Sequence, residues 1–328
     1  MRLLVTGGAG YVGSVVAAQL LAAGHQVTVL DDLSTGHADA VPAGAEFVAA
    51  SITEAGPTLA RGFDAVLHFA AKSLVAESVG RPELYWHNNV AGSLALLEAM
   101  RAADVRRIVF SSTAACYGEP DRVPIVEDSP TKPTNTYGAS KLAVDQMLSG
   151  YCTAYGFSAV SLRYFNVAGA LIRDEQPLGE RHATETHLIP IALDVAAGRR
   201  PALQINGTDW PTPDGTTVRD YIHILDLADA HQRALSWTGE HQGHLICNLG
   251  SGSGASVREV VEAVRRVTGR PTPAEDGPVR AGDPATLIAS NDRARSVLDW
   301  RPERDLDRMV ADAWAFHQLA GQPVSTGA

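Results

Sequence analysis

The stretch RLLVTGGAGYVG, residues 2–13, decides the fold class of this chain. A short apolar run leads into glycines at positions 7, 10 and 13, and a helical pattern follows. In such a strand–turn–helix unit, Gly7 permits a tight turn, Gly10 lets the backbone approach a pyrophosphate, and Gly13 lets the helix pack close to the sheet. The N-terminus of the helix adds N–H groups and positive potential, which favour a bound phosphate. The stretch therefore predicts a dinucleotide-binding loop.

Strands and helices alternate through the first half of the chain. Apolar runs without strict alternation are typical of strands that are covered on both faces. They predict strands at residues 2–6, 26–31, 45–50, 64–70, 106–112 and 158–166, with helices near 11–23, 53–61, 82–103 and 137–155. This order predicts an α/β fold, a Rossmann-type doubly wound parallel sheet with right-handed crossovers and a smaller C-terminal α/β substrate-binding lobe.

The pattern loosens after residue 166. Residues 169–185 predict a long polar loop, 187–198 a short helix, and 209–224 a turn-rich hairpin. A helix from Asp226 and a strand at 244–250 restore the α/β pattern, and a capping box at Ser256 and Glu259 opens a further helix. We expect residues 1–166 to form the nucleotide-binding domain, with 224–250 returning to it. The smaller lobe then comprises residues 167–223 and 251–328.

Composition and charge narrow the class of protein. The 328 residues are 45% hydrophobic and 20% charged, as in an ordinary soluble globular protein, and the net charge of −10 gives no support for nucleic-acid binding. No apolar run reaches the roughly 18–20 residues that span a membrane, and because the first strand starts at Arg2 we expect no signal peptide. Cys116, Cys152 and Cys247 are widely spaced, which argues against disulfides and against a metal site and favours the cytoplasm.

The second predicted strand ends in Asp31 and Asp32, about 24 residues after Gly7. A carboxylate at this position accepts hydrogen bonds from both ribose hydroxyls of an adenosine and repels a 2′-phosphate. Either residue alone would also suit an ordinary turn after a strand. Together with the glycine loop, the pair predicts that the cofactor is NAD rather than NADP.

A tyrosine, a lysine and a threonine suggest the chemistry. Thr113 lies in SSTAACYG, at the carboxyl end of the fifth predicted strand, where ligands bind in such sheets. Tyr137 and Lys141 share one helix face four residues apart, a spacing that is common at ordinary helix starts. A phenol has a pKa near 10, and lowering it by about 3 units requires roughly 4 kcal/mol, which an ammonium and a nicotinamide cation could supply. Tyr137 could then take a proton from a substrate alcohol, with Thr113 bonded to the same oxygen.

Motifs along nearly the whole chain resemble those of the extended short-chain dehydrogenase/reductase family. They are TGGAGYVGS, HFAA, NNVAG, SSTAACYG, YGASK, RYFNVAGA, VRDYIHILDLADAH, NLGSG and RAGDPA. The later blocks resemble the nucleotide-sugar 4-epimerases of that family. This resemblance implies reversible C4 epimerisation of UDP-glucose and UDP-galactose through a 4-keto sugar, with tightly retained NAD. It also implies a homodimer that pairs the helices near 82–103 and 137–155.

The resemblance also implies the site residues. The catalytic residues are Thr113, Tyr137 and Lys141. The cofactor contacts are Gly7, Gly10, Tyr11, Val12, Gly13, Asp31, Asp32, Ser51, Ile52, Phe69, Ala70, Ala71, Asn88, Ser111, Tyr137, Lys141 and Tyr164. The UDP-sugar contacts are Thr113, Tyr137, Asn166, His187, Leu188, Arg219, Arg280, Asp283 and Leu287. Arginine suits a diphosphate because its planar fork donates several hydrogen bonds.

Several positions depart from the family pattern. Ser51 replaces an adenine-contacting aspartate, Asn206 replaces a frequent phenylalanine near the uracil, and Ser73 stands where some members have a cofactor-contacting lysine. Leu287 replaces a tyrosine of some members, and we hypothesise that this smaller side chain admits N-acetylated sugars.

Other functions on the same fold stay open. A UDP-glucuronate epimerase or decarboxylase is an enzyme alternative that stays open. A 4,6-dehydratase is disfavoured because Ala114 and Ala115 follow Thr113, where that reaction uses an Asp-Glu pair. A non-catalytic NAD-sensing protein is disfavoured by the Tyr137–Lys141 pair.

Overall fold

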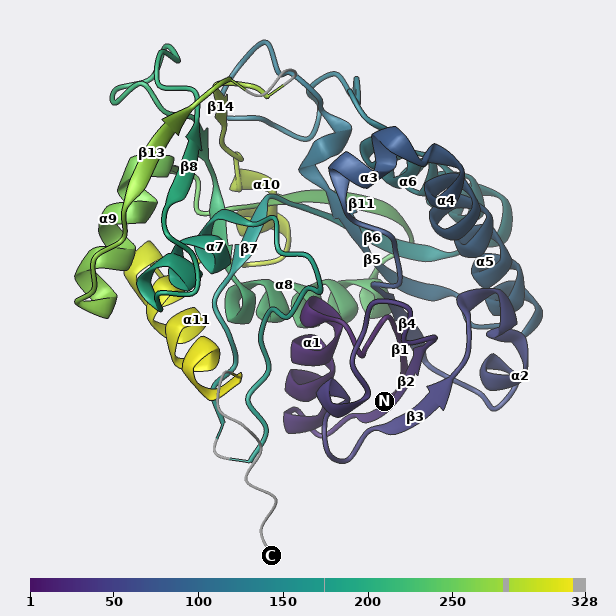
Figure 1. Cartoon of the computed structure of the whole chain (residues 1–328). Coiled ribbons are helices and arrows are strands. Elements are labelled where there is room, and N and C mark those ends of the chain that lie inside the picture. Colours follow the sequence, from purple (N-terminus) through teal and green to yellow (C-terminus); the bar gives the residue numbers. More distant parts are fainter. Residues whose placement is uncertain (174, 280–282, 321–328) are drawn as a thin grey trace, which may run out of the picture.

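The computed structural model, which describes residues 1–173, 175–279 and 283–320, is built around a seven-stranded parallel sheet (Figure 1). The strand order is β11-β6-β5-β4-β1-β2-β3. The strands are β1 (Arg2–Thr6), β2 (Gln26–Asp31), β3 (Glu46–Ala49), β4 (Ala65–His68), β5 (Arg107–Thr113), β6 (Ser158–Tyr164) and β11 (Gly243–Leu249). The predicted α/β fold is confirmed.

The strand order reverses beside β1. Thr6 of β1 pairs with Leu30 of β2 on one side and with His68 of β4 on the other. In an open α/β sheet, ligands bind outside the carboxyl ends of the strands where the order reverses. The segments that follow β1 and β4 therefore border the expected crevice.

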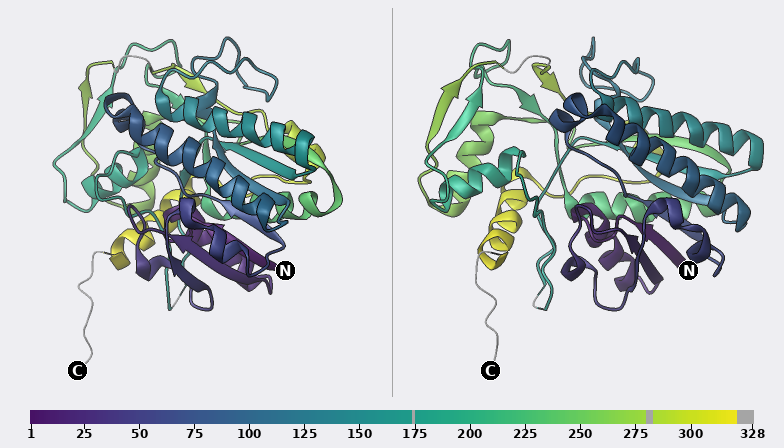
Figure 2. Two further views of the ribbon diagram at one scale, coloured as in Figure 1. Left: turned by 90° about the vertical axis from the view of Figure 1, so that its right-hand side faces the viewer. Right: turned by 45° about the vertical axis from the view of Figure 1, so that its right-hand side comes forward.

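Helices cover both faces of the sheet (Figure 2). They are α1 (Tyr11–Ala22), α2 (Gly56–Leu59), α3 (Val75–Gly80), α4 (Pro82–Tyr85), α5 (Gly92–Ala102), α6 (Thr136–Tyr155) and α8 (Ile224–Glu240). Successive strand residues point to opposite faces, so Leu3 and Val5 join the core beside α1 and α8, whereas Leu4 joins the core beside α5 and α6. Both cores are buried, which explains the continuous apolar runs of the sequence.

Two predicted helices are interrupted. The helix predicted at 53–61 is wrong in its first turn, where a 3-10 turn at Ile52–Glu54 precedes α2. Pro57 has no N–H to donate, so it is tolerated only in the first turn of α2. The helix predicted at 82–103 contains a π-helical turn, Trp86–Ala91, between α4 and α5. Such turns often mark functional sites.

The described chain also forms further short strands and four further helices. The strands are β7 (Asn166–Ala168), β8 (Leu203–Asn206), β9 (Val218–Arg219), β10 (Tyr221–His223), β12 (Ala255–Ser256), β13 (Ala274–Gly277) and β14 (Thr286–Leu287). The helices are α7 (Leu188–Ala196), α9 (Val257–Thr268), α10 (Asp292–Val297) and α11 (Leu306–Ala320). The capping box of Ser256 and Glu259 opens α9 as predicted.

The hairpin predicted at 209–224 is wrong. β9 pairs with β12 and β14, whereas β10 pairs with β7, so the two neighbouring strands belong to different sheets. The buried carboxylate of Asp220 lies between them and accepts hydrogen bonds from the backbone N–H groups of Ser251 and Ala289, at 2.6 and 3.0 Å. These long-range bonds turn the chain away from a hairpin. The strand predicted at 158–166 likewise divides into β6 and β7.

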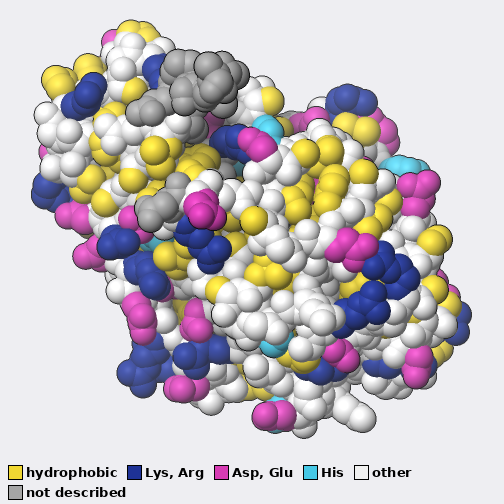
Figure 3. All heavy atoms as spheres, turned by 90° about the horizontal axis from the view of Figure 1, so that it is seen from below, with side chains coloured by type: hydrophobic (Ala, Val, Ile, Leu, Met, Phe, Trp, Pro, Cys, Tyr) yellow, Lys and Arg dark blue, Asp and Glu magenta, His cyan; other side chains and the backbone are white. Residues whose placement is uncertain are grey.

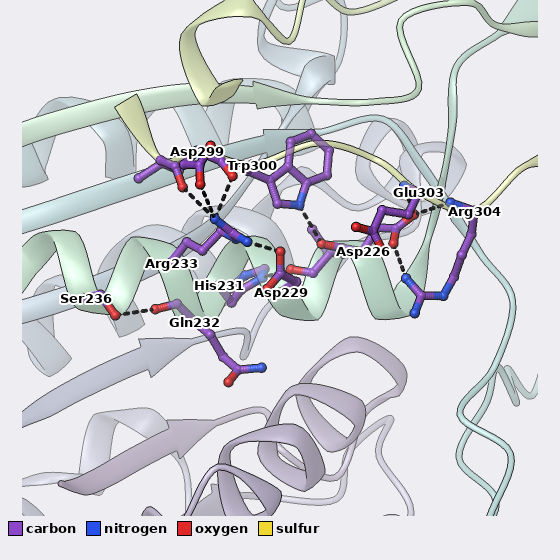
Figure 4. A network of polar contacts seen from close by, with 12 residues as sticks. Asp226, Asp229, His231, Gln232, Arg233, Ser236, Asp299, Trp300, Glu303 and Arg304 are labelled. Atoms are coloured by element: carbon purple, nitrogen blue, oxygen red, sulfur yellow. Dashed lines mark hydrogen bonds and ion pairs between the residues drawn. The ribbon is translucent and has the colours of Figure 1, made fainter. Parts of the chain in front are cut away.

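The segment that follows α10 folds back onto α8 (Figure 4). The buried indole of Trp300 donates from Nε1 to the carbonyl of Asp226 at 2.8 Å. The Asp226 carboxylate accepts from the backbone N–H groups of Glu303 and Arg304, at 3.1 and 3.0 Å, and pairs with the Arg304 guanidinium. Because Asp226 lies in the first turn of α8, its charge also complements the helix dipole.

Acidic and basic side chains are interspersed on the face shown in Figure 3, with hydrophobic side chains between them. Within the described ranges, no helix combines the length and apolar character that a membrane span requires. Cys116 and Cys247 are buried, Cys152 is half-buried, and all three thiols are free.

Candidate active site

The glycine loop leaves β1 and opens α1, as the sequence predicts. Gly7 has a φ of +73°, and a Cβ there would lie 2.4 Å from the backbone nitrogen of Ala70. A Cβ at Gly13 would lie 2.2 Å from the carbonyl oxygen of Gly7. Gly10 is the N-cap of α1 and offers no side chain to the first N–H groups of that helix. The loop therefore presents backbone donors at a helix N-terminus, which suits a pyrophosphate.

Other predicted cofactor residues surround this loop. Asp31 is buried, and its carboxylate accepts from the backbone N–H groups of Ala9 at 3.0 Å and Leu33 at 2.8 Å. Burial raises the pKa of Asp31, and the two N–H donors oppose that shift. Asp32 is exposed and accepts only from the N–H of Ser34, among the contacts of the described chain. Asp31 thus both braces the glycine loop and keeps lone pairs for a ribose.

The side chain of Tyr11 links the loop to the smaller lobe. Its hydroxyl donates to the carbonyl of Gly169 at 2.6 Å. Val12, the next residue of α1, packs against the core beside the sheet. Ser51 caps the 3-10 turn that contains buried Ile52, with its hydroxyl accepting from the N–H of Thr53 at 3.3 Å.

The segment after β4 is held by a residue that sequence reasoning missed. The N–H groups of Phe69 and Ala70 donate to the carbonyl of Thr6 at 2.9 and 3.1 Å, which sets Ala70 and Ala71 beside the glycine loop. Buried Asn89 accepts from the N–H of Lys72 at 2.8 Å and donates to its carbonyl at 3.0 Å.

Asn89 lies in the π-helical turn and also donates to the Ser140 hydroxyl of α6 at 3.0 Å. Its neighbour Asn88, which was predicted to contact the cofactor, donates to the Asn89 side chain at 3.0 Å. Two adjacent asparagines inside a helical pattern could have indicated this interruption from the sequence, because asparagine is a weak helix former.

Tyr137, Lys141 and Thr113 meet at the carboxyl edge of the sheet. Asn135 caps α6 by accepting from the N–H of Gly138 at 2.9 Å, so Tyr137 lies in the first turn of the helix. Lys141 is 2% exposed, and its Nζ donates to the carbonyl of Ser111 on β5 at 2.7 Å. Thr113 ends β5, and its hydroxyl accepts from the N–H of Ala115 at 3.2 Å.

Burial controls the titration of this group. It lowers the pKa of Lys141 to about 7, with the Asp145 carboxylate opposing the shift. It raises the pKa of Tyr137, and the Thr113 hydroxyl opposes that shift. The ligand-free chain therefore does not itself make a phenolate at neutral pH, so the predicted activation of Tyr137 depends on the positive charge of a bound cofactor. Tyr164, whose hydroxyl shares a short hydrogen bond with Ser111 Oγ, also has its pKa raised by burial.

A buried ion pair between α6 and β6 lies next to this group, and it was not predicted from the sequence. Asp145 lies one turn after Lys141 on α6 and pairs with Arg163 of β6 at 2.9 Å, with 3% and 4% of their side chains exposed. Asp145 also accepts from the Ser112 hydroxyl at 3.2 Å, and Arg163 donates to the hydroxyl of Tyr117 at 3.0 Å. The spacing of Lys141 and Asp145 was a usable signal, because residues four apart share a helix face.

Part of the predicted substrate set comes together in the smaller lobe. Arg219 of β9 lies 3.8 Å from the Asp283 carboxylate and pairs with Leu287 of β14. Asn166 is exposed at the start of β7, and its backbone N–H donates to the carbonyl of Asp220 at 3.0 Å. Arg280 lies outside the described residues.

His187 and Leu188 lie at the start of α7. The imidazole of His187 contacts the carboxylates of Glu180 and Glu185, and Leu188 packs against the core of the smaller lobe. These contacts do not place either residue beside Arg219.

The chain matches known proteins over nearly its whole length. A model of the NAD dependent epimerase/dehydratase family matches residues 3–250. The chain belongs to this family. It is 57% identical over 324 residues to the UDP-glucose 4-epimerase of Corynebacterium glutamicum, with 98% of this chain and 97% of that protein covered.

Two solved structures of UDP-glucose 4-epimerases share the fold. The UDP-glucose 4-epimerase of Stenotrophomonas maltophila, solved with bound NAD and formylated UDP-arabinopyranose, matches with a TM-score of 0.93 and 39% identity, covering 98% of each chain. The Brucella ovis enzyme, solved in complex with NAD, matches with a TM-score of 0.92 and 44% identity, covering 96% of this chain and 98% of that one. The predicted resemblance to nucleotide-sugar 4-epimerases is confirmed.

The glycine loop of this family member fits an NAD pyrophosphate and adenosine. The N-terminus of α1 carries no capping side chain, and a Cβ at Gly10 would meet a single atom of the described chain, at 3.4 Å. The Asp31 carboxylate is fixed by two backbone donors at the end of β2. Open donors and a fixed carboxylate suit a pyrophosphate and a ribose, respectively.

Proposed function

We propose that this chain interconverts UDP-glucose and UDP-galactose by transient oxidation at C4 of the sugar, with NAD as its cofactor. The observation that carries the proposal lies at the carboxyl end of β5, where the side chains of Tyr137 and Thr113 are hydrogen-bonded and Lys141 Nζ donates to the Ser111 carbonyl. Near-full-length similarity to UDP-glucose 4-epimerases supports the same reaction.

The residues of the chain handle the proton. When bound, NAD supplies a reversible hydride acceptor, so each turnover ends without net redox change. Tyr137 takes the proton of the C4 hydroxyl as that carbon is oxidised, and returns it to the same oxygen when the opposite face of the 4-keto sugar is reduced. Thr113 holds this oxygen, and the Lys141 ammonium, fixed by the Ser111 carbonyl, favours the phenolate.

The smaller lobe would hold the UDP group. Arg219 is a suitable partner for the diphosphate because its side chain is 16% exposed, lies in a short strand, and has Asp283 as a countercharge at 3.8 Å. The UDP group must stay bound during turnover, because the 4-keto sugar has to rotate within the site without leaving the protein. We also propose that Asn166, His187 and Leu188 contact the UDP-sugar, and that the predicted cofactor residues contact NAD.

The proposal is tested by incubating the purified protein with UDP-galactose and measuring UDP-glucose without added NAD. We expect conversion by the parent protein. We expect a loss of about 10²–10⁴-fold in Tyr137→Phe, with bound NAD retained in that variant. Absence of conversion by a parent protein that carries NAD would refute the proposal, and conversion of UDP-glucuronate instead would favour the alternative enzyme class.

We also propose a homodimer that works in the cytoplasm. Trp86 and Leu94, in the helical region predicted to pair, are 45% and 44% exposed, which favours an apolar contact with a second copy. Light scattering after size exclusion is expected to give twice the chain mass, and Leu94→Glu is expected to give the monomer. A monomeric parent protein would contradict this proposal.

The domain boundaries are proposed as predicted. Residues 1–166 with 224–250 bind NAD, and residues 167–223 with 251–328 bind the UDP-sugar. The pairing of β11 with β6 supports the return of residues 224–250 to the first domain.

A further inference from the structure

We propose that Glu180, His182, Glu185 and His187 bind a divalent transition-metal ion of the zinc class. All four lie in the loop that leads into α7, and one ligand atom from each lies within 4.8 Å of the others. The sequence predicts no metal site, and of these four residues only His187 also belongs to the proposed UDP-sugar site. The inference therefore goes beyond the proposed epimerisation.

The distances between these atoms suit tetrahedral coordination. His182 Nδ1 lies 3.1 Å from Glu180 Oε1 and 3.4 Å from Glu185 Oε2, and His187 Nδ1 lies 3.5 Å from Glu185 Oε1. Zinc binds imidazole nitrogen and carboxylate oxygen at about 2.0–2.2 Å, so neighbouring ligand atoms of a tetrahedron are about 3.4 Å apart. These three nitrogen–oxygen separations match that spacing, whereas His187 Nδ1 and Glu180 Oε1 lie closer together, in direct contact.

Burial and charge also favour a cation. The Glu180 side chain is 8% exposed, and a carboxylate so buried requires a compensating partner. The Nδ1 atom of His182 is buried and has no hydrogen-bond partner in the described chain, although both carboxylates lie within ion-pair distance. As metal ligands the two imidazoles would be deprotonated, so the four side chains would carry two negative charges together, which one divalent ion would neutralise.

The surroundings give the site access and a structural role. A cavity of about 260 Å³ is lined by Glu180, His182 and Glu185, together with residues of α7 and α11. The loop also contacts the first domain, since the Arg181 carbonyl lies 2.8 Å from His37 Nε2 and the Arg181 guanidinium pairs with Asp39. Four protein ligands leave no open coordination position, as in structural zinc sites. The ion would therefore fasten this loop between the two lobes.

The experiment uses the full chain and Zn²⁺ alone. The protein is stripped with a chelator, dialysed and titrated by calorimetry, and its melting temperature is recorded with and without the ion. We expect about one Zn²⁺ per chain and a melting temperature that rises with Zn²⁺ and falls again with chelator. The stripped parent protein by itself decides the proposal, because uptake well below one equivalent would overturn it.

Matched variants locate the site. The Glu185 carboxylate accepts hydrogen bonds from the backbone N–H groups of Thr186 and His187, at 2.7 and 2.8 Å. Glu185→Gln keeps an oxygen that can accept these bonds but removes the negative charge. We expect Glu185→Gln and His182→Gln to lose at least tenfold in Zn²⁺ affinity. His241→Gln, whose ring contacts the Trp237 carbonyl at the end of α8, is expected to bind like the parent. Equal affinity in all three variants would show an unrelated site and overturn the proposal, leaving the cluster as a metal-free His–Glu ion network.

Discussion

Lys141 is a buried cation whose effect on stability can be predicted with its sign. Its pKa falls from 10.5 to about 7 because burial penalises the ammonium. Below about pH 7 the lysine is protonated in both the folded and the unfolded chain, and the penalty for burying the charge is complete. Between about pH 7 and 10.5 the unfolded chain binds more protons, so the free energy of unfolding rises with pH. Above that range both states are neutral and the penalty is gone.

The magnitude follows from the shift. A displacement of this size corresponds to about 5 kcal/mol in full, of which about 3 to 4 kcal/mol is recovered between pH 7 and pH 10. Lys141→Met removes the titrating group. It also leaves the Ser111 carbonyl without its 2.7 Å donor, but that cost is the same at every pH. The difference in unfolding free energy between the parent and this variant therefore isolates the titration of Lys141.

The assay is urea unfolding of both ligand-free proteins at pH 7, 8, 9 and 10, analysed by linear extrapolation. We expect the parent protein to gain about 3 to 4 kcal/mol relative to Lys141→Met across this range, because all other groups titrate alike in the two chains. A difference that stays constant within about 1 kcal/mol would refute the reasoning that Lys141 is a buried, weakly solvated cation.

Three further changes test other parts of the site. Asp145→Asn leaves the Arg163 guanidinium buried without its carboxylate, so we expect the free energy of unfolding in urea to fall by about 3–5 kcal/mol. The double variant Asp145→Leu with Arg163→Met is expected to restore most of this stability. A fall of less than about 1 kcal/mol in Asp145→Asn would contradict the reasoning. Asp31→Ala removes the acceptor of the Ala9 and Leu33 N–H groups, and we expect NAD affinity to fall about 10–100-fold by calorimetry, whereas unchanged affinity would argue against a cofactor role. Leu287→Tyr is expected to abolish turnover of UDP-N-acetylglucosamine while turnover of UDP-glucose persists, and a parent protein that cannot turn over the N-acetylated sugar would rule out the pocket hypothesis.

Sequence reasoning succeeded where local geometry is encoded by neighbouring residues. Gly7 and Gly13 predicted the turn after β1 and the close packing of α1, and both glycines lie where a Cβ would clash with backbone. The Ser256–Glu259 capping box predicted the start of α9. The spacing of Tyr137 and Lys141 placed both on α6. In each case the interacting atoms are a few residues apart, so the pattern and the structure report the same geometry.

Sequence reasoning failed where very short strands are selected by distant partners. β9 and β10 follow one another within residues 209–224, which were predicted to form a hairpin, yet the two strands enter different sheets. Their separation depends on buried Asp220, which binds the backbone near Ser251 and Ala289. A two-residue strand has too little pattern to specify its partner, so long-range hydrogen bonds decide the pairing.

The sequence by itself therefore determined the parallel sheet, the glycine loop, the aspartate Asp31 at the end of β2 and the placing of Tyr137 and Lys141 on one helix. The tertiary structure alone decided what holds them, including the Lys141 bond to the Ser111 carbonyl and the Asp145–Arg163 ion pair beneath it. It also brought Arg219 to Asp283 and Leu287. The physical reason is that burial, which lowers the pKa of Lys141 and makes the loss of one partner of an ion pair costly, is a property of the packed chain and not of any short stretch.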